Sequence, residues 1–218
     1  MRHTTLLIVD DNPVIRQGLR SLFDAEDRIE VVGEASTGAE AIRWVRKYSA
    51  DVVLMDIRMP IVDGIRATAE ILRIRPEAKI LILTVSEDPR DLARSLHAGA
   101  KGYLVYSRFA PEELLNAVYA VASGEEIPPS PAVVLALADL PEDESRAQFL
   151  QDHPRVDPLT ARETEILDLI AEGRSNAEIA QSLAIEEKTV KNHITRLYSK
   201  LNIGSRYEAI RLRLLHLR

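Results

Sequence analysis

Three short aliphatic runs in this chain are each followed directly by side chains that carry oxygen. The runs and the residues after them are Leu6–Val9 with Asp10 and Asp11, Val52–Met55 with Asp56, and Ile80–Leu83 with Thr84. Each run precedes a helical pattern, which is typical of buried parallel strands in an α/β sheet. Because ligands bind beyond the carboxyl ends of the strands in such sheets, we expect three carboxylates and one hydroxyl to meet at one edge.

This set of oxygen atoms predicts a magnesium site. Carboxylates that lie close together repel one another unless a cation neutralises them, and ligand sets made only of oxygen suit a hard ion such as Mg²⁺. A carboxylate beside Mg²⁺ can also accept a phosphoryl group. A single Asp after a strand is more often a helix cap or a solvated group, so the prediction rests on the whole set of four side chains.

The first 122 residues alternate between strand and helix patterns. The predicted strands cover residues 5–9, 29–35, 51–55, 79–83 and 102–105, and the predicted helices cover residues 13–24, 37–48, 64–75, 89–98 and 111–122. Pro13, Pro89 and Pro111 fit the first turns of helices, where the missing N–H costs little. Five such units predict a doubly wound, five-stranded parallel sheet with helices on both faces.

The rest of the chain has a different pattern. Residues 123–157 hold five prolines and an acidic run, which predicts a linker, and within it we expect a short helix over Ala132–Leu140 that packs on the first domain. Residues 158–218 show three capping-box patterns, which predict an all-helical domain. The three patterns begin at Thr160, Ser175 and Ser205. The expected organisation is a domain at 1–122, a linker at 123–157 and a domain at 158–218.

Composition narrows the classes of protein that this chain can belong to. It has no cysteine, which excludes disulfides and Cys-based zinc sites, and no apolar stretch approaches the ~20 residues of a membrane span. We expect a cytoplasmic protein with no membrane partner. The net charge of −6 hides a basic segment, because Lys188–Arg218 holds eight basic residues and one acid. Such a run is often only a solvated helix face, but it is also typical of nucleic-acid binding.

Residues 175–201 predict two helices joined by a short turn, a helix-turn-helix arrangement. The second of these has apolar residues at i, i+4, i+7 and i+11 from Val190, which must face a core. Its opposite face is expected to enter the DNA major groove, and further residues are expected to contact phosphates. His193 is expected to flank this face or to contact a phosphate. The groove residues are Lys188, Lys191, Asn192 and Thr195, and the phosphate residues are Thr189, Arg196, Lys200 and Arg206. The alternative is a small helical domain that binds protein.

Residues 158–218 resemble the LuxR-type (GerE) helix-turn-helix domain. The matching segments are Leu159-Thr160-Ala-Arg-Glu163, Glu165-Ile-Leu167, Gly173, Asn176-Ala-Glu-Ile-Ala180, Lys188-Thr-Val-Lys-Asn-His-Ile194 and Lys200-Leu-Asn-Ile-Gly-Ser-Arg206. Glu186 stands where the family often has a serine cap, and a carboxylate there is also favourable. The resemblance implies binding to double-stranded DNA as a homodimer at two half-sites.

Residues 1–122 resemble a response-regulator receiver domain, and the two domains together resemble the NarL/FixJ group of two-component response regulators. The matching segments are Val9-Asp-Asp-Asn-Pro13, Met55-Asp-Ile-Arg-Met-Pro60, Asp63-Gly64, Leu83-Thr84 and Ala98-Gly-Ala-Lys-Gly-Tyr103. The resemblance implies a non-enzymatic transcription regulator in which Asp56 receives a phosphoryl group from a sensor histidine kinase. Thr84 would bond the phosphoryl oxygens, and Tyr103 would turn inward in response. The implied Mg²⁺ ligands are Asp10, Asp11, Asp56 and the backbone carbonyl of Arg58.

One position departs from the receiver pattern. The strand that carries Tyr103 normally ends in a lysine that pairs with the phosphoryl group, and Tyr106 stands at that position here. A phenol can donate a hydrogen bond but supplies no charge, and charge-assisted bonds are roughly twice as strong as neutral ones. We therefore expect the phosphorylated state to be less favoured, or the switch to be uncoupled from phosphorylation.

Two other functions fit parts of the sequence. A phosphatase can use an Asp nucleophile beside Mg²⁺, but it needs a second carboxylate as general acid, and the usual position, two residues after Asp56, holds Arg58. A DNA-binding regulator controlled by a ligand or protein partner, without phosphorylation, is the second alternative, and Tyr106 is its support.

Overall fold

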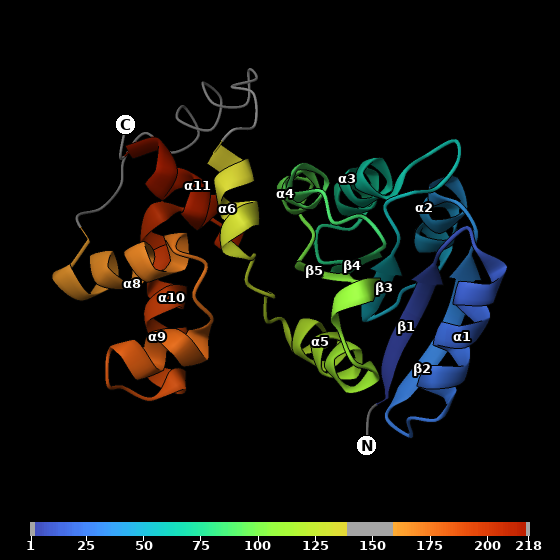
Figure 1. Ribbon diagram of the computed structural model, residues 1–218, viewed down its shortest axis with the longest axis horizontal. Helices are drawn as coiled ribbons and strands as arrows, with labels where there is room; N and C mark the ends of the chain where they lie inside the picture. Colours follow the sequence, from blue (N-terminus) through green and yellow to red (C-terminus); the bar gives the residue numbers. More distant parts are fainter. Residues whose placement is uncertain (1–2, 139–158, 217–218) are drawn as a thin grey trace. The chain divides into compact units, whose positions relative to one another are not determined.

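The computed structural model describes residues 3–138 and 159–216, and Figure 1 shows the chain as a ribbon. The chain divides into two compact units, Met1–Ile127 and Pro128–Arg218. Most of the predicted linker, from residue 139 onward, lies outside the described residues. Within those described residues, none of the helices is both long and apolar enough to cross a bilayer.

The first unit contains the predicted doubly wound sheet. Its strands are β1 Thr4–Val9, β2 Ile29–Ala35, β3 Val52–Met55, β4 Ile80–Thr84 and β5 Gly102–Val105. They are all parallel and lie in the order β2-β1-β3-β4-β5. This confirms the predicted fold class, and it places the ends of β1 and β3 side by side at the centre of the sheet.

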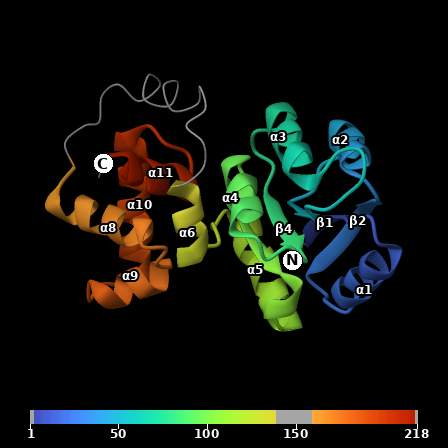
Figure 2. The same cartoon turned by 45° about the horizontal axis from the view of Figure 1, so that its top comes forward.

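Five helices cover the two faces of this sheet. They are α1 Pro13–Asp24, α2 Gly38–Lys47, α3 Gly64–Ile74, α4 Pro89–His97 and α5 Pro111–Ser123. Figure 2 shows α1 and α5 on one face and α2, α3 and α4 on the other. Phe23 of α1 and Leu114 of α5 are buried in one core with Leu6, Ile8 and Leu54 of the strands. Successive strand residues point to opposite faces, and every residue of the central strands β3 and β4 is buried, so these strands are covered on both sides.

Close packing fixes the loop that follows β3. Gly64 begins α3 and lies against the backbone of Asp56, where a Cβ on Gly64 would come 1.9 Å from the Asp56 carbonyl oxygen. The Gly64 N–H donates to the Ile57 carbonyl at 3.0 Å, and the Asp63 side chain caps the helix by accepting from Arg66 N–H at 2.7 Å. The Asp63-Gly64 pair therefore holds the loop that presents Asp56.

The second unit is helical throughout its described part. Its helices are α6 Pro131–Ala138, α8 Ala161–Ala171, α9 Asn176–Ser182, α10 Glu187–Leu201 and α11 Arg206–His216. The short helix expected within the linker is present as α6, but it contacts α11 and belongs to the second unit. The expectation that it packs on the first domain was wrong, because the helix contacts α11 within the second unit.

Two of the three predicted capping boxes have the expected bonds. The boxes that begin α8 and α9 join Thr160 with Glu163 and Ser175 with Glu178 in both directions. At α11 half of the box forms, because the Ser205 hydroxyl oxygen accepts from the Glu208 N–H at 3.1 Å. The Glu208 carboxylate accepts from the Gly204 N–H at 2.6 Å. The α9–α10 turn then passes through Ala184, whose φ of 52° is left-handed. The three capping-box patterns therefore predicted the starts of α8, α9 and α11 correctly, although the hydrogen bonds at α11 differ from those of a full capping box.

Candidate functional site

The three aspartates lie together at the carboxyl edge of the sheet. Val9 pairs with Met55 in the register of β1 and β3, and the Asp56 N–H donates to the Val9 carbonyl at 2.8 Å. Carboxylate oxygens of Asp10, Asp11 and Asp56 all lie within 4.8 Å of one another. Three hard oxygen donors at this spacing fit a divalent cation such as Mg²⁺.

Asp10 is held in place on both of its carboxylate oxygens. Its Oδ1 accepts from the Asn12 N–H at 2.8 Å, and its Oδ2 accepts from the Tyr106 hydroxyl at 3.3 Å. The residue is only 3% exposed, and this burial raises its pKa. Asp11, in contrast, is exposed, so the site opens to solvent on that side.

The protein environment disfavours the charged form of Asp56. It is 7% exposed, and burial, followed by the nearby Asp10 carboxylate, raises its pKa to about 6. Hydrogen bonds from Thr84 and from the Arg58 and Ile57 N–H groups oppose that rise. A buried carboxylate beside a second one gains more than a solvated one from a bound cation.

Thr84 and the two predicted switch tyrosines lie on the neighbouring strands. Thr84 ends β4, is fully buried and accepts from the Ser86 N–H at 3.1 Å. Tyr103 is half-buried on β5. Tyr106 begins a short 3₁₀ helix, Tyr106–Arg108. Tyr106 reaches the acidic cluster, as its place in the receiver pattern implied. Its bond to Asp10 was not predicted, because the two residues lie 96 positions apart.

Arg58 contributes a contact that the sequence did not suggest. Its guanidinium pairs with the carboxylate of Asp91, in the first turn of α4, and the same carboxylate accepts from the Ser86 hydroxyl at 3.0 Å. The loops after β3 and β4 are thus joined through α4. The sequence signal for Asp91 was only that of an acid near a helix N-terminus.

The second unit presents polar side chains on one face of α10. Of the predicted apolar stripe, Val190, Leu197 and Leu201 are buried and Ile194 is half-buried. The predicted DNA contacts Lys188, Asn192, Thr195 and Arg196 are exposed. Partly buried predicted contacts are Thr189, Lys191 and His193. The Lys191 ammonium lies 3.1 Å from the Glu187 carboxylate, one turn back. A basic helix face with an apolar opposite face has the form needed to enter a major groove.

Each of the two units matches a known protein family. Residues 6–119 match the family model described as the response regulator receiver domain, and residues 157–213 match that of the bacterial regulatory proteins of the luxR family. The chain belongs to the LuxR-family response regulators. It is therefore a DNA-binding transcription regulator of the two-component type.

Relatives of this response regulator match it over nearly its whole length. It is 40% identical to the uncharacterised transcriptional regulatory protein YhcZ of Bacillus subtilis over 94% of this chain and 92% of that protein. It is 36% identical to the response regulator UvrY of Escherichia coli over 97% of this chain and 94% of that protein. A crystal form of RcsB from Salmonella typhimurium matches with a TM-score of 0.55 and 27% identity, covering all of both chains.

Two residues expected to contact DNA phosphates form bonds within the LuxR-type domain. Arg206 is 5% exposed, and its guanidinium donates to the Arg174 carbonyl and, at 3.3 Å, to Asn176. Lys200 lies 2.7 Å from the buried Glu163 carboxylate. The structure contradicts the expected phosphate contact of Arg206, because its guanidinium is buried and bonds within the domain. The phosphate contact of Lys200 stays a prediction, since its side chain is 32% exposed beside Glu163.

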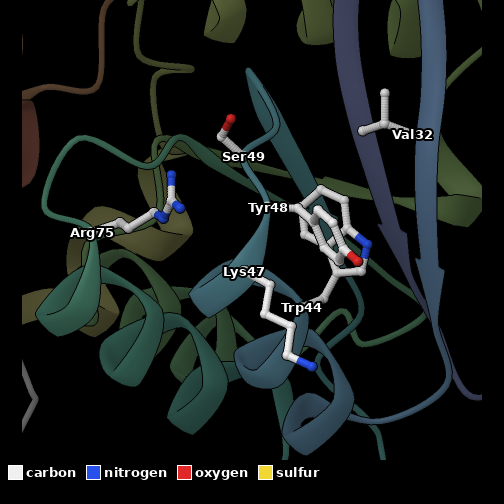
Figure 3. A pocket seen from close by; sticks show the side chains of 6 residues that line it. All are labelled: Val32, Trp44, Lys47, Tyr48, Ser49 and Arg75. Carbon is white, nitrogen blue, oxygen red and sulfur yellow. The ribbon is translucent and has the colours of Figure 1, made fainter.

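A surface pocket of the receiver unit lies away from the carboxylates. Figure 3 shows it at the end of α2, lined by Val32, Trp44, Lys47, Tyr48, Ser49 and Arg75. The rings of Trp44 and Tyr48 lie 5.4 Å apart, and Gly33 leaves room for the Trp44 ring. Because α2 ends where the chain turns back toward the start of β3, this pocket lies at the opposite edge of the sheet from Asp56.

Proposed function

We propose that this response regulator is phosphorylated on Asp56 by a sensor histidine kinase and that phosphorylation controls its binding to DNA. The observation that supports this is the group of three carboxylates within 4.8 Å, in which Asp56 is buried and its pKa is raised to about 6. In the transfer, an Asp56 oxygen forms a bond to phosphorus while the phosphorus–nitrogen bond of a phosphohistidine breaks. The electron pair returns to the imidazole, which takes up a proton.

The ligands that fit Mg²⁺ are the carboxylates of Asp10, Asp11 and Asp56 with the backbone carbonyl of Arg58. When bound, the ion supplies charge neutralisation for the carboxylates and the phosphoryl oxygens. Asp56 acts as nucleophile, and the Thr84 hydroxyl, which already reaches the Asp56 carboxylate, bonds a phosphoryl oxygen once it is present. Tyr103 then follows Thr84 inward, which gives the differential contact that a two-state switch needs.

For the DNA-binding half, we propose that the exposed face of α10 enters the major groove, with the protein acting as a homodimer in the bacterial cytoplasm. A structure of an RcsB–DNA complex, 26% identical to this chain with a TM-score of 0.55, supports this use of the fold. The domain limits we propose are 1–122 and 158–218, joined by a linker at 123–157 whose helix α6 packs with the second unit.

The experiment compares DNA affinity for the wild type and for Asp56→Asn, each with and without a small-molecule phosphodonor and Mg²⁺. We expect the donor to tighten binding roughly tenfold in the wild type, a typical coupling between sites, and to leave the variant unchanged. Equal affinities in all four states would reject the phosphorylation switch.

The second candidate is a LuxR-family regulator that binds DNA independently of phosphorylation. The observation that favours it is Tyr106, which brings a neutral hydroxyl to the site where the family places a cation. Tight DNA binding that is equal in all four states of the experiment above supports this candidate, and donor-dependent binding rejects it.

A further inference from the structure

Tyr106 joins the end of β5 to the acidic cluster. Its hydroxyl donates to Asp10 Oδ2 at 3.3 Å, across the strands that lie between β5 and β1 in the sheet. The other oxygen of Asp10 accepts from the Asn12 N–H at 2.8 Å. With one donor on each oxygen, the orientation of the Asp10 carboxylate is fixed.

These two bonds leave Asp10 able to bind a cation. Each carboxylate oxygen has two lone pairs, so an oxygen that accepts one hydrogen bond can still coordinate a metal. A phenol is protonated at neutral pH, so Tyr106 acts as a donor toward the carboxylate.

The Tyr106 ring is held by its own surroundings. It packs against the core beneath β1, β3 and β4, and its centroid lies 5.9 Å from that of Phe109. A side chain braced in this way holds its hydrogen-bond partner in one orientation, which is what a metal ligand requires of the groups behind it.

We propose that Tyr106 is a positioning residue that orients Asp10 for a divalent cation, so that this site is adapted to the metal more than to the phosphoryl anion. The proposal rests on the proposed function of the same carboxylates. A lysine at this position would attract the anion but repel the cation, whereas a neutral donor orients a metal ligand without opposing the metal charge.

The test is a calorimetric titration of the full chain with Mg²⁺ alone, comparing the wild type with Tyr106→Phe. The substitution removes one oxygen and keeps the ring against Phe109. Loss of a hydrogen bond behind a metal ligand typically weakens affinity 10–100-fold, so we expect at least about tenfold weaker Mg²⁺ binding. The matched control is Tyr119→Phe, which removes a hydroxyl that donates to Glu26 at 3.2 Å and should leave Mg²⁺ affinity unchanged.

A second variant tests the other half of the proposal, which is the preference of this site for the cation over the phosphoryl anion. Tyr106→Lys should also weaken Mg²⁺ binding, and it should slow the dissociation of beryllofluoride, a phosphoryl analogue, from Asp56. Cooperative thermal unfolding of every variant checks the fold. Because a structural role alone would move the melting temperature and leave the ion affinity of the folded protein unchanged, the affinity is the deciding readout.

The outcomes separate this proposal from the function on which it rests. If the wild type binds Mg²⁺ and beryllofluoride while Tyr106→Phe binds Mg²⁺ equally well or more tightly, the positioning role is overturned and the phosphorylation site stands. If the wild type binds no Mg²⁺, both are overturned. Weaker Mg²⁺ binding by Tyr106→Phe, with Tyr119→Phe unchanged, supports the role of Tyr106.

Discussion

The carboxyl edge of the sheet and the exposed face of α10 use charge in opposite ways. Asp10 and Asp56 are removed from water and held by strand ends and by donors, so one proton or one hydrogen bond changes the energy of the site. Lys188 and Arg196 remain in water on a helix surface, where single charges contribute little to folding. The first region is therefore sensitive to a single change of charge, whereas the second presents its charged groups to solvent, where a charged partner can reach them.

The largest effect on stability is expected where the backbone itself holds the carboxylate edge. Gly64→Ala places a Cβ 1.9 Å from the Asp56 carbonyl oxygen, and such overpacking should lower the free energy of unfolding by about 3 kcal/mol or more. Urea unfolding measures this change. The matched control is Gly18→Ala in α1, where no atom lies within 4 Å of the added Cβ and a gain of roughly 0.5–1 kcal/mol is expected. Equal effects of the two substitutions would contradict the packing around Asp56.

The next effect tests the cost of the Asp56 charge. Its folded-state pKa of about 6 lies above the ordinary 3.8, so the folded state binds more protons and stability falls as pH rises from about 4 to 6. Above pH 6 the full penalty applies, on the order of 3 kcal/mol at ~1.4 kcal/mol for each pKa unit. In the presence of EDTA, Asp56→Asn should therefore be more stable than the wild type at pH 8 but not near pH 4.

Denaturant unfolding at both pH values checks this expectation. Asp11→Asn is the control at the same edge, because Asp11 is exposed and its replacement should change stability little. If Asp56→Asn is less stable than the wild type at pH 8, the charge of Asp56 does not destabilise the metal-free protein.

A smaller effect is expected from the ion pair inside the LuxR-type domain. Bonds from Lys200 and then Thr160 lower the pKa of Glu163 to about 2 from the ordinary 4.5. This stabilisation is complete above about pH 4.5 and is lost as pH falls toward 2. Glu163→Gln should therefore lower the melting temperature at pH 7, and the deficit should shrink at pH 3. Thermal unfolding at the two pH values measures it, and a deficit that does not depend on pH would contradict the ion pair.

The smallest effect on folding is expected on the DNA-facing side of α10. Arg196→Ala should change the free energy of unfolding by no more than about 0.5 kcal/mol, yet weaken DNA binding and reduce its salt slope by about one. Arg206→Ala should do the opposite, because its guanidinium bonds to Arg174 and Asn176 inside the domain. DNA titrations across a salt series, together with melting temperatures, distinguish the two arginines. A large loss of stability in Arg196→Ala would contradict the account, because it would show that the exposed face of α10, like the carboxyl edge of the sheet, contributes strongly to folding.

Sequence patterns predicted the elements of this protein well because each signal was local. Aliphatic runs marked the buried strands, and Pro13, Pro89 and Pro111 marked the helix starts that the structure shows. The carboxylates were predicted to meet because parallel strands bring their carboxyl ends to one edge, a consequence of topology alone.

The missed features all depend on tertiary contacts between distant residues. Nothing around Arg206 in the sequence distinguishes a buried guanidinium from one that contacts phosphate, because its partners lie 30 or more positions away. The bond from Tyr106 to Asp10 and the pairing of Arg58 with Asp91 arise in the same way. The position of α6 was also not predictable, since an apolar helix can pack on either unit.

The most direct test of the central claim is mass spectrometry of the intact protein after incubation with a phosphodonor, with Mg²⁺ or with EDTA. The account predicts one added phosphoryl group in the wild type with Mg²⁺, little or none with EDTA, and none in Asp56→Asn. Phosphoryl incorporation that is equal with EDTA, or that persists in Asp56→Asn, would contradict it.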